Sequence, residues 1–154
     1  MENSIHFKST TPSDIDTIVS LMQDFYAIDH YPMDTEKSKL LFRTFIENET
    51  LGKSWLIYHN NQIVGYVILT FVFSFEYGST IAFLDELYLS ETARGKGIGK
   101  AALQFIQTEA LKLKLKVIYL EVENHNENAQ KLYIAHDFAV HHRKLMKYIV
   151  KEHT

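Results

Sequence analysis

Apolar and polar residues follow two periodicities along this chain, and together they predict an alternation of strands and helices. Runs that are continuously apolar or alternate with a period of two predict strands at 5–9, 54–59, 62–75, 81–89, 117–122, 138–142 and 145–150. Helical periodicity predicts helices at 12–27, from Asp34 to near Asn48, from Ile98 to about Leu113, and from Asn126 to near His136. The order predicts an α/β fold, a mixed sheet of six to seven strands with helices on both faces.

Residues typical of helix N-termini and of turns support these boundaries. Thr11-Pro12-Ser13-Asp14 supplies an N-cap, a proline in the first turn and an acidic residue. Asn60-Asn61 suits a hairpin turn with positive φ. The apolar positions expected to face the core include Phe25 and Tyr26 in the first helix, and Leu40, Leu41, Phe42, Phe45 and Ile46 in the second.

Composition narrows the classes of protein. A chain of 154 residues fits one domain, 1–154, and a net charge of -3 argues against a general nucleic-acid binder. The absence of cysteine excludes disulfides, thiolate metal ligands and a cysteine nucleophile, and the eight histidines lack metal-site spacing, so no metal is expected. With no membrane-length apolar stretch and no leader pattern, we expect a cytoplasmic protein without a membrane partner.

A glycine-rich segment, Arg94-Gly95-Lys96-Gly97-Ile98-Gly99-Lys100, lies between a strand and an amphipathic helix. Glycines allow close backbone approach, and the free N–H groups of a helix N-terminus attract an anion, so the segment predicts a phosphate cradle. A P-loop is excluded, because Gly95 and Gly99 are one residue too close and Ala101 replaces the metal-binding hydroxyl. The fit of 97–102 to a dinucleotide fingerprint is weak, since a polar link follows the strand and too few residues remain for that fold.

Two motifs in sequence order give this chain a resemblance to the GNAT superfamily of acyl-CoA-dependent N-acetyltransferases. Arg94-x-x-Gly97-x-Gly99 is similar to the pyrophosphate loop of that family, and Asn126-x-x-Ala129-x-x-Leu132-Tyr133 is similar to its second helix. The resemblance covers about 81–150 and implies a single-domain GNAT-like fold. Where the family commonly has Gly-Phe after this helix, the chain has Asp137-Phe138, and Asp tolerates the left-handed conformation of a helix end.

The resemblance implies that acetyl-CoA, the acyl donor, lies along one strand and the glycine-rich loop. The strand contributes backbone amides, one of which polarises the acetyl carbonyl, and the second helix contributes an asparagine that also serves as its N-cap. The residues implied to bind acetyl-CoA are Leu87, Tyr88, Leu89, Arg94, Gly95, Lys96, Gly97, Ile98, Gly99, Lys100 and Asn126.

Three residues are candidates for proton transfer. The resemblance places the general acid at Tyr133, whose phenol is protonated at neutral pH, although packing is the alternative role. Asp85 and Glu86 are adjacent acids in an apolar strand, which is costly unless they face a wet cleft or a partner. Alternation places them on opposite faces, but the resemblance implies that this strand often has a bulge that shifts the phase. The resemblance also implies the base at the position of Asp85, as in several small-amine acetyltransferases, so we favour Asp85 over Glu86.

The acceptor expected from these features is a primary amine of a small molecule, polyamine-like or amino-acid-like. The candidate acceptor-binding residues are Asp29, Phe73, Phe75 and Glu76, although the alternating phenylalanines also fit a buried sheet face. A peptide N-terminus or protein lysine is an alternative acceptor, and a non-catalytic acetyl-CoA-binding regulatory module is an alternative of another class. The sequence is also compatible with a homodimer.

Overall fold

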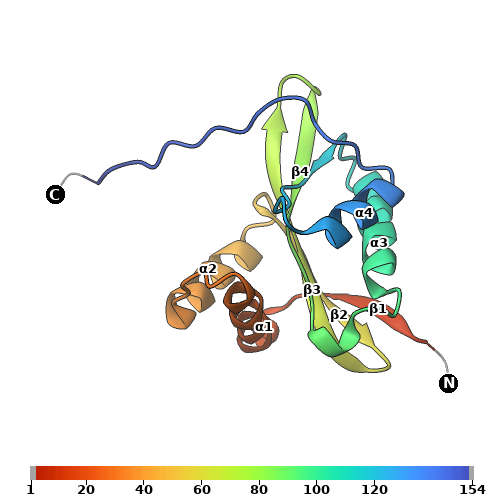
Figure 1. The fold of residues 1–154 in the computed structure, drawn as a ribbon. Helices are drawn as coiled ribbons and strands as arrows, with labels where there is room; N and C mark the ends of the chain where they lie inside the picture. The colour runs from red at the N-terminus through yellow and green to blue at the C-terminus, as the bar shows by residue number, and fades with distance from the viewer. Residues whose placement is uncertain (1–2, 153–154) are drawn as a thin grey trace.

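The computed structural model describes residues 3–152, so the first two and last two residues of the expected domain lie outside the described range. One sheet in the order β1-β2-β3-β4-β5 forms its centre (Figure 1), antiparallel from β1 to β4 and parallel between β4 and β5. The elements are β1 (Ile5–Ser9), the 3₁₀ turn η1 (Pro12–Asp14), α1 (Ile15–Ile28), α2 (Thr35–Glu47), β2 (Gly52–His59), β3 (Gln62–Ser74), β4 (Ser79–Leu89), η2 (Glu91–Ala93), α3 (Ile98–Lys112), β5 (Ile118–Tyr119) and α4 (Glu127–Ala135).

Helices cover both faces of the sheet, as the sequence predicts (Figure 1). On one face α1 and α2 pack over a core that includes Ile18, Tyr66 and Tyr88. On the other face α3 and α4 pack over a second core, which includes Leu103 and Ile106. Each helix buries one apolar stripe against the sheet, so the sheet is the wall between two separate cores.

The N-terminal half follows the predicted boundaries closely, with two corrections. The first turn after Thr11 is a 3₁₀ turn and α1 begins at Ile15, while Asp34 caps α2 by accepting from the Lys37 backbone N–H at 3.1 Å. Leu40 and Leu41 are exposed rather than inward. Five apolar residues span more than one helical stripe, and only Phe42 of α2 becomes fully buried against α1 and the sheet.

The predicted count of six to seven strands is wrong, because the sheet formed by the described residues has five. The segments 138–142 and 145–150 are extended but pair with no strand among residues 3–152, and β5 pairs over only two residues instead of the expected 117–122. A period of two indicates two-faced extended chain, but a strand also needs backbone hydrogen bonds to a neighbouring strand, which periodicity alone does not ensure. Here the C-terminal segment is tied instead by Arg143, which donates to Glu76 at 2.6 and 3.1 Å, and then extends away from the sheet (Figure 1).

No helix within residues 3–152 combines the length and the apolar character that crossing a membrane requires.

Candidate active site

A β-bulge in β4 brings the two adjacent acids to one side of the sheet. Ile68 of β3 is opposite Glu86, while Leu69 is opposite Leu84, which leaves Asp85 without a cross-strand partner. The extra residue reverses the alternation, so Leu84 and Leu87 both pack in the core under α3. Asp85 and Glu86 therefore both face the α1–α2 side, the outcome expected if a bulge shifts the phase.

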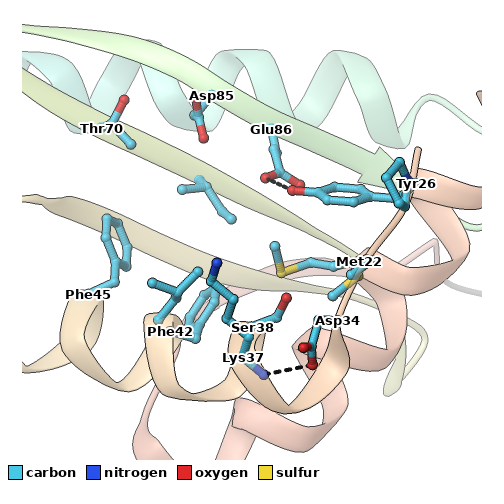
Figure 2. A pocket seen from close by; sticks show the side chains of 14 residues that line it. Met22, Tyr26, Asp34, Lys37, Ser38, Phe42, Phe45, Thr70, Asp85 and Glu86 are labelled. Carbon is cyan, nitrogen blue, oxygen red and sulfur yellow. Dashed lines mark hydrogen bonds between the residues drawn. The ribbon is translucent and has the colours of Figure 1, made fainter. Parts of the chain in front are cut away.

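The acids lie in a cleft of about 740 Å³ between the helices α1 and α2 and the strands β3 and β4 (Figure 2). Figure 2 shows Asp85 and Glu86 on the sheet wall and Lys37 and Ser38 on the α2 wall. Much of the remaining lining is apolar, with contributions from Met22, Met33, Leu41, Phe42, Phe45 and Ile68. The cleft thus combines a few charged groups with an apolar lining, as small-molecule sites commonly do.

Glu86 is held by two phenols. The hydroxyl of Tyr26 on α1 donates to Glu86 Oε2 at 2.8 Å, and the hydroxyl of Tyr66 on β3 donates to Oε1 at 2.7 Å. Burial raises the pKa of Glu86, while these two hydrogen bonds lower it in part and the charge of Asp85 adds to the increase. Both tyrosines in turn have pKa values well above their ordinary range, because they are buried beside this carboxylate, so they remain protonated donors.

Tyr26 and Tyr66 were not identified as site residues from the sequence. Tyr26 was expected in the core, and it is partly buried there. A fully buried tyrosine such as Tyr66 usually needs a hydrogen-bond partner, which was the one signal available. The packing of α1 and β3 against β4 decides which acceptor the hydroxyl meets, and no local sequence pattern reveals that packing.

Asp85 differs from its neighbour, because its carboxylate has no hydrogen-bond or ion-pair partner within residues 3–152 and opens into the cleft. Partial burial raises its pKa above the ordinary value for aspartate. The pair therefore consists of one fixed carboxylate and one free carboxylate in the same cleft, and both gain protons more readily than ordinary acids do.

The glycine-rich loop has two left-handed glycines directly before α3, the backbone geometry expected of an anion cradle. Gly95 and Gly97 have φ values of 76° and 79°, and an added Cβ at either position would meet no protein atom within 4 Å. The glycines are thus required by backbone conformation rather than by crowding from the protein. Gly97 is the N-cap of α3 and provides no side-chain cap, which leaves the first N–H groups of this helix available to an anion.

The cationic residues of the loop have different positions. Lys96 and Lys100 are exposed, whereas Arg94 Nε donates to the Leu89 carbonyl at 3.1 Å and links the loop to the end of β4. At Gly99 an added Cβ would lie 3.2 Å from Leu132 Cδ2, so this glycine allows α3 to approach α4 closely. The second motif glycine therefore has a packing role, separate from that of Gly97.

Beyond Phe83 the two parallel strands β4 and β5 stop pairing. The register joins Ala82 to Ile118 and Phe83 to Tyr119, and no further pair follows within the described residues. The side chains of Leu87 and Leu89 belong to one core and that of Tyr88 to the other, as expected for residues whose contribution is their backbone. The edge of β4 at 87–89 is therefore open to an extended ligand.

Helix α4 completes this side of the molecule. The Asn126 side chain accepts from the Ala129 backbone N–H at 3.2 Å, which confirms its N-cap role. Tyr133 packs on Phe138 at a ring distance of 5.7 Å, and burial raises the pKa of its phenol. Asp137 has a φ of 71°, the left-handed conformation that the sequence predicts at this helix end.

The structure places the four expected acceptor-binding residues outside the cleft. Asp29 faces His125 at 3.8 Å, and Glu76 binds Arg143. Phe73 and Phe75 lie toward the tip of the β3–β4 hairpin, 67% and 91% exposed, so they do not form a buried sheet face either. No group of three His, Cys, Asp or Glu side chains suited to a metal ion occurs among residues 3–152.

Comparison with known proteins gives a consistent result. The model of the Acetyltransferase (GNAT) family matches residues 16–138. A D-amino-acid N-acetyltransferase of Saccharomyces cerevisiae is 32% identical over 53 residues, which is 34% of this chain and 33% of that protein, so the match spans about a third of this relative's length.

Solved structures agree along nearly the whole chain. An integron cassette protein from the mobile metagenome of Cole Harbour Salt Marsh has a TM-score of 0.85 and 27% identity, with 95% of this chain and 91% of that one covered. A predicted acetyltransferase from Clostridium acetobutylicum, crystallised with acetyl-CoA, has a TM-score of 0.79 and 18% identity over 94% and 96% of the two chains. Acetyl-CoA is the acyl donor of this family. With the family model matched over most of its length, the chain belongs to the GNAT acetyltransferase family.

Proposed function

We propose that this protein transfers the acetyl group of acetyl-CoA directly to a primary amine of a small molecule. The observation that carries the proposal is the bulge in β4, which places Asp85 and Glu86 together in one cleft. The same strand continues into the open edge at 87–89 and then into the glycine-rich loop. One strand thus connects an amine-attracting cleft to an anion-binding cradle.

On the acyl-donor side, the chain's backbone fits the expected ligand. Acetyl-CoA supplies an activated acetyl thioester and a pyrophosphate. The free amides at the start of α3, with Lys96 and Lys100 nearby, are assigned to the pyrophosphate, and the β4 amides at 87–89 to the pantetheine arm and the acetyl carbonyl. Asn126 is assigned to the pantetheine arm as well as to its helix cap.

On the acceptor side, the side chains supply the proton transfers. An ammonium must lose a proton before it can attack a carbonyl, and Asp85 or Glu86 accepts it, directly or through water. We favour Asp85, because its carboxylate is free while Glu86 is engaged by two phenols. Tyr133, kept protonated by burial, is assigned as the acid that protonates the departing thiolate.

An acceptor screen with thiol release as its readout tests the proposal. Small primary amines, a peptide with a free N-terminus and a lysine-containing peptide are compared at equal concentration. We expect turnover with small amines, consistent with a cleft of about 740 Å³ and with the activity named for the yeast relative. Turnover confined to peptides would favour the alternative acceptors, and tight acetyl-CoA binding with no turnover would favour a regulatory module.

We also propose a homodimer formed through the C-terminal segment 139–152. This segment exposes the apolar side chains of Val140, Leu145, Met146, Tyr148, Ile149 and Val150. Monomers rarely expose so many adjacent apolar groups, and β5 is the last strand of the sheet, so we propose that the segment of a second copy pairs at its outer edge. Sedimentation should give about twice the chain mass of 18.0 kDa, and Met146→Asp with Ile149→Asp should restore the monomer mass. A monomeric wild type would contradict the dimer.

A further inference from the structure

The cleft has opposite charges on its two walls. Asp85 and Glu86 lie on the β4 wall, and Lys37 lies on the α2 wall. In Figure 2 the amino group of Lys37 extends from α2 toward the sheet, across the space that the acids face. Asp34, at the start of α2, also lines the cleft, but its carboxylate caps the helix by accepting from the Lys37 backbone N–H. A ligand in this cleft therefore meets two carboxylates at the β4 wall and the Lys37 ammonium at the α2 wall.

Lys37 is available to a ligand. Asp34, the N-cap of α2, accepts from the Lys37 backbone N–H, and the Lys37 side chain forms no ion pair within residues 3–152. Lys39, two residues later, differs, because its amino group lies 3.4 Å from Asp16 and 3.5 Å from Glu36 and lines no part of the cleft. The three N–H donors of Lys37 thus have no protein carboxylate to satisfy them.

Apolar groups fill the space between the two charged walls. Met22, Met33, Phe42, Phe45 and Ile68 come from both helices and from β3. Two methionines make this lining adaptable in shape, and the aromatic rings give it a large apolar area. The lining suits a branched or aromatic hydrocarbon group better than a flexible polycation, whose second ammonium would face Lys37.

We propose that the acceptor is an apolar amino acid, with its ammonium at Asp85 and Glu86, its carboxylate at Lys37 and its side chain among the apolar lining. This inference rests on the proposed function and adds the substrate class and a specificity-determining residue, Lys37. A lysine paired with a substrate carboxylate forms a charge-assisted hydrogen bond, which is stronger than a neutral one.

The test compares three amines that share one hydrocarbon group: leucine as either enantiomer, leucinamide and 3-methylbutylamine. Kinetics with saturating acetyl-CoA are measured for the wild type, Lys37→Met, Lys37→Arg and Lys37→Glu. Lys39→Met is the matched control, because it removes the same charge from the same helix outside the cleft. Calorimetric titration of leucine and 3-methylbutylamine in the presence of CoA gives affinities that do not depend on turnover.

The wild type should prefer one leucine enantiomer over leucinamide and 3-methylbutylamine by about 10- to 100-fold in kcat/KM, the range of a hydrogen bond to a charged group. Lys37→Met should raise the KM for leucine by a similar factor with little change in kcat and leave 3-methylbutylamine unaffected. Lys37→Arg should retain the preference, Lys37→Glu should reverse it toward 1,5-diaminopentane, and Lys39→Met should match the wild type.

The outcomes separate this inference from the proposed function. Acetylation of all three amines with no preference for a carboxylate, or an equal loss in Lys37→Met for all three, would overturn the inference and leave the acetyltransferase in place. Leucine binding that depends on Lys37 without turnover of any amine would support the inference and contradict the proposed function. If leucine is neither bound nor acetylated, the amino-acid assignment is overturned.

Discussion

The two halves of the candidate site are built from different parts of the chain. The acyl-donor half consists mainly of backbone: two left-handed glycines, the start of α3 and the unpaired edge of β4. The acceptor half consists of side chains that four elements, α1, α2, β3 and β4, direct into one cleft. A backbone cradle depends on conformation, so few substitutions are tolerated, whereas a cleft lined by side chains can change its ligand while the fold stays the same.

A change in the backbone half should have the largest effect. Gly97→Asp places a side chain and a negative charge where the pyrophosphate is expected, at a residue with a φ of 79°. Acetyl-CoA at about a hundredfold excess over its Kd should stabilise the wild type by about 2.7 kcal/mol, and this stabilisation should vanish in the variant. Thermal denaturation with and without acetyl-CoA measures it, with NAD as a ligand that should stabilise neither protein.

Gly78→Asp is the matched control for that substitution. Gly78 also has a left-handed φ, 64°, with nothing within 4 Å of an added Cβ, but it lies in the turn between β3 and β4. Both variants place aspartate at a left-handed φ, so the loss of acetyl-CoA stabilisation is the result that should distinguish them. A loss of the acetyl-CoA response in Gly78→Asp would mean that backbone strain, not the cradle, is responsible.

In the side-chain half, Asp85→Asn and Glu86→Gln should reduce turnover unequally and leave acetyl-CoA binding nearly intact. The base should account for about 10²–10⁴-fold in rate. A base acts only when deprotonated, so kcat/KM should rise with pH through its pKa, which burial raises above the usual carboxyl value. The pH–rate profile of each variant identifies the base, since only its replacement removes this rise. Equal losses independent of pH would mean that both acids bind substrate or support the fold.

Tyr133 is related to both halves of the candidate site. It lies on α4, which packs beside α3 and the glycine-rich loop, and it is assigned to proton transfer. Tyr133→Phe should lower kcat by about 10²-fold, the low end of the range for a positioned acid, since a thiolate leaves readily. The acetyl-CoA Kd should change little, because the ring still packs on Phe138. Steady-state kinetics with a direct binding measurement tests this. An unchanged kcat where chemistry limits the rate would leave Tyr133 as a packing residue.

The smallest effects on turnover are expected from replacing the phenols that hold Glu86. Their hydrogen bonds lower the pKa of Glu86, so Tyr26→Phe or Tyr66→Phe should raise it. If Glu86 is the base, the rise of kcat/KM should move to higher pH. On the acidic limb kcat/KM should fall about tenfold for each unit by which the pKa increases, and at pH values above the pKa it should not change. If Asp85 is the base, the profile should move only slightly.

The same variants should lose stability in a way that depends on pH. Removing a hydrogen bond to a charged group costs about 1.5–3 kcal/mol, and Glu86 needs both donors most when it is ionised. The loss should therefore grow as pH rises through the pKa of Glu86. Urea denaturation at two pH values measures this loss of stability.

Tyr58→Phe is the control for these variants. The Tyr58 ring packs in the same core and stacks on His6 at 4.7 Å, and its hydroxyl forms no side-chain hydrogen bond among residues 3–152. An equal loss in Tyr58→Phe would mean that the hydroxyl bonds to Glu86 are not the cause.

The sequence by itself determined the features that depend on short segments. The glycine-rich loop, the caps at Asp34 and Asn126, the left-handed Asn60, Asn61 and Asp137, and helices on both faces all follow from local conformation and periodicity, and the structure agrees. Membership of the acetyltransferase family was predicted from two motifs of this kind and is confirmed. Such features are decided within a few residues, where glycine, asparagine and aspartate have distinct backbone preferences.

Only the tertiary structure decided which side chains meet. Nothing local indicates that Tyr26, Lys37 and Glu86 share a cleft or that the buried Tyr66 donates to Glu86, since each comes from a different element. The acceptor residues expected from the sequence lie elsewhere. The C-terminal segment shows the same limit of local patterns. Its alternation predicts two strands, but the five-stranded sheet of the described residues does not include them. Periodicity reports the two faces of a segment, but a partner edge, a bulge or an opposing helix lies far away in sequence and is set by packing.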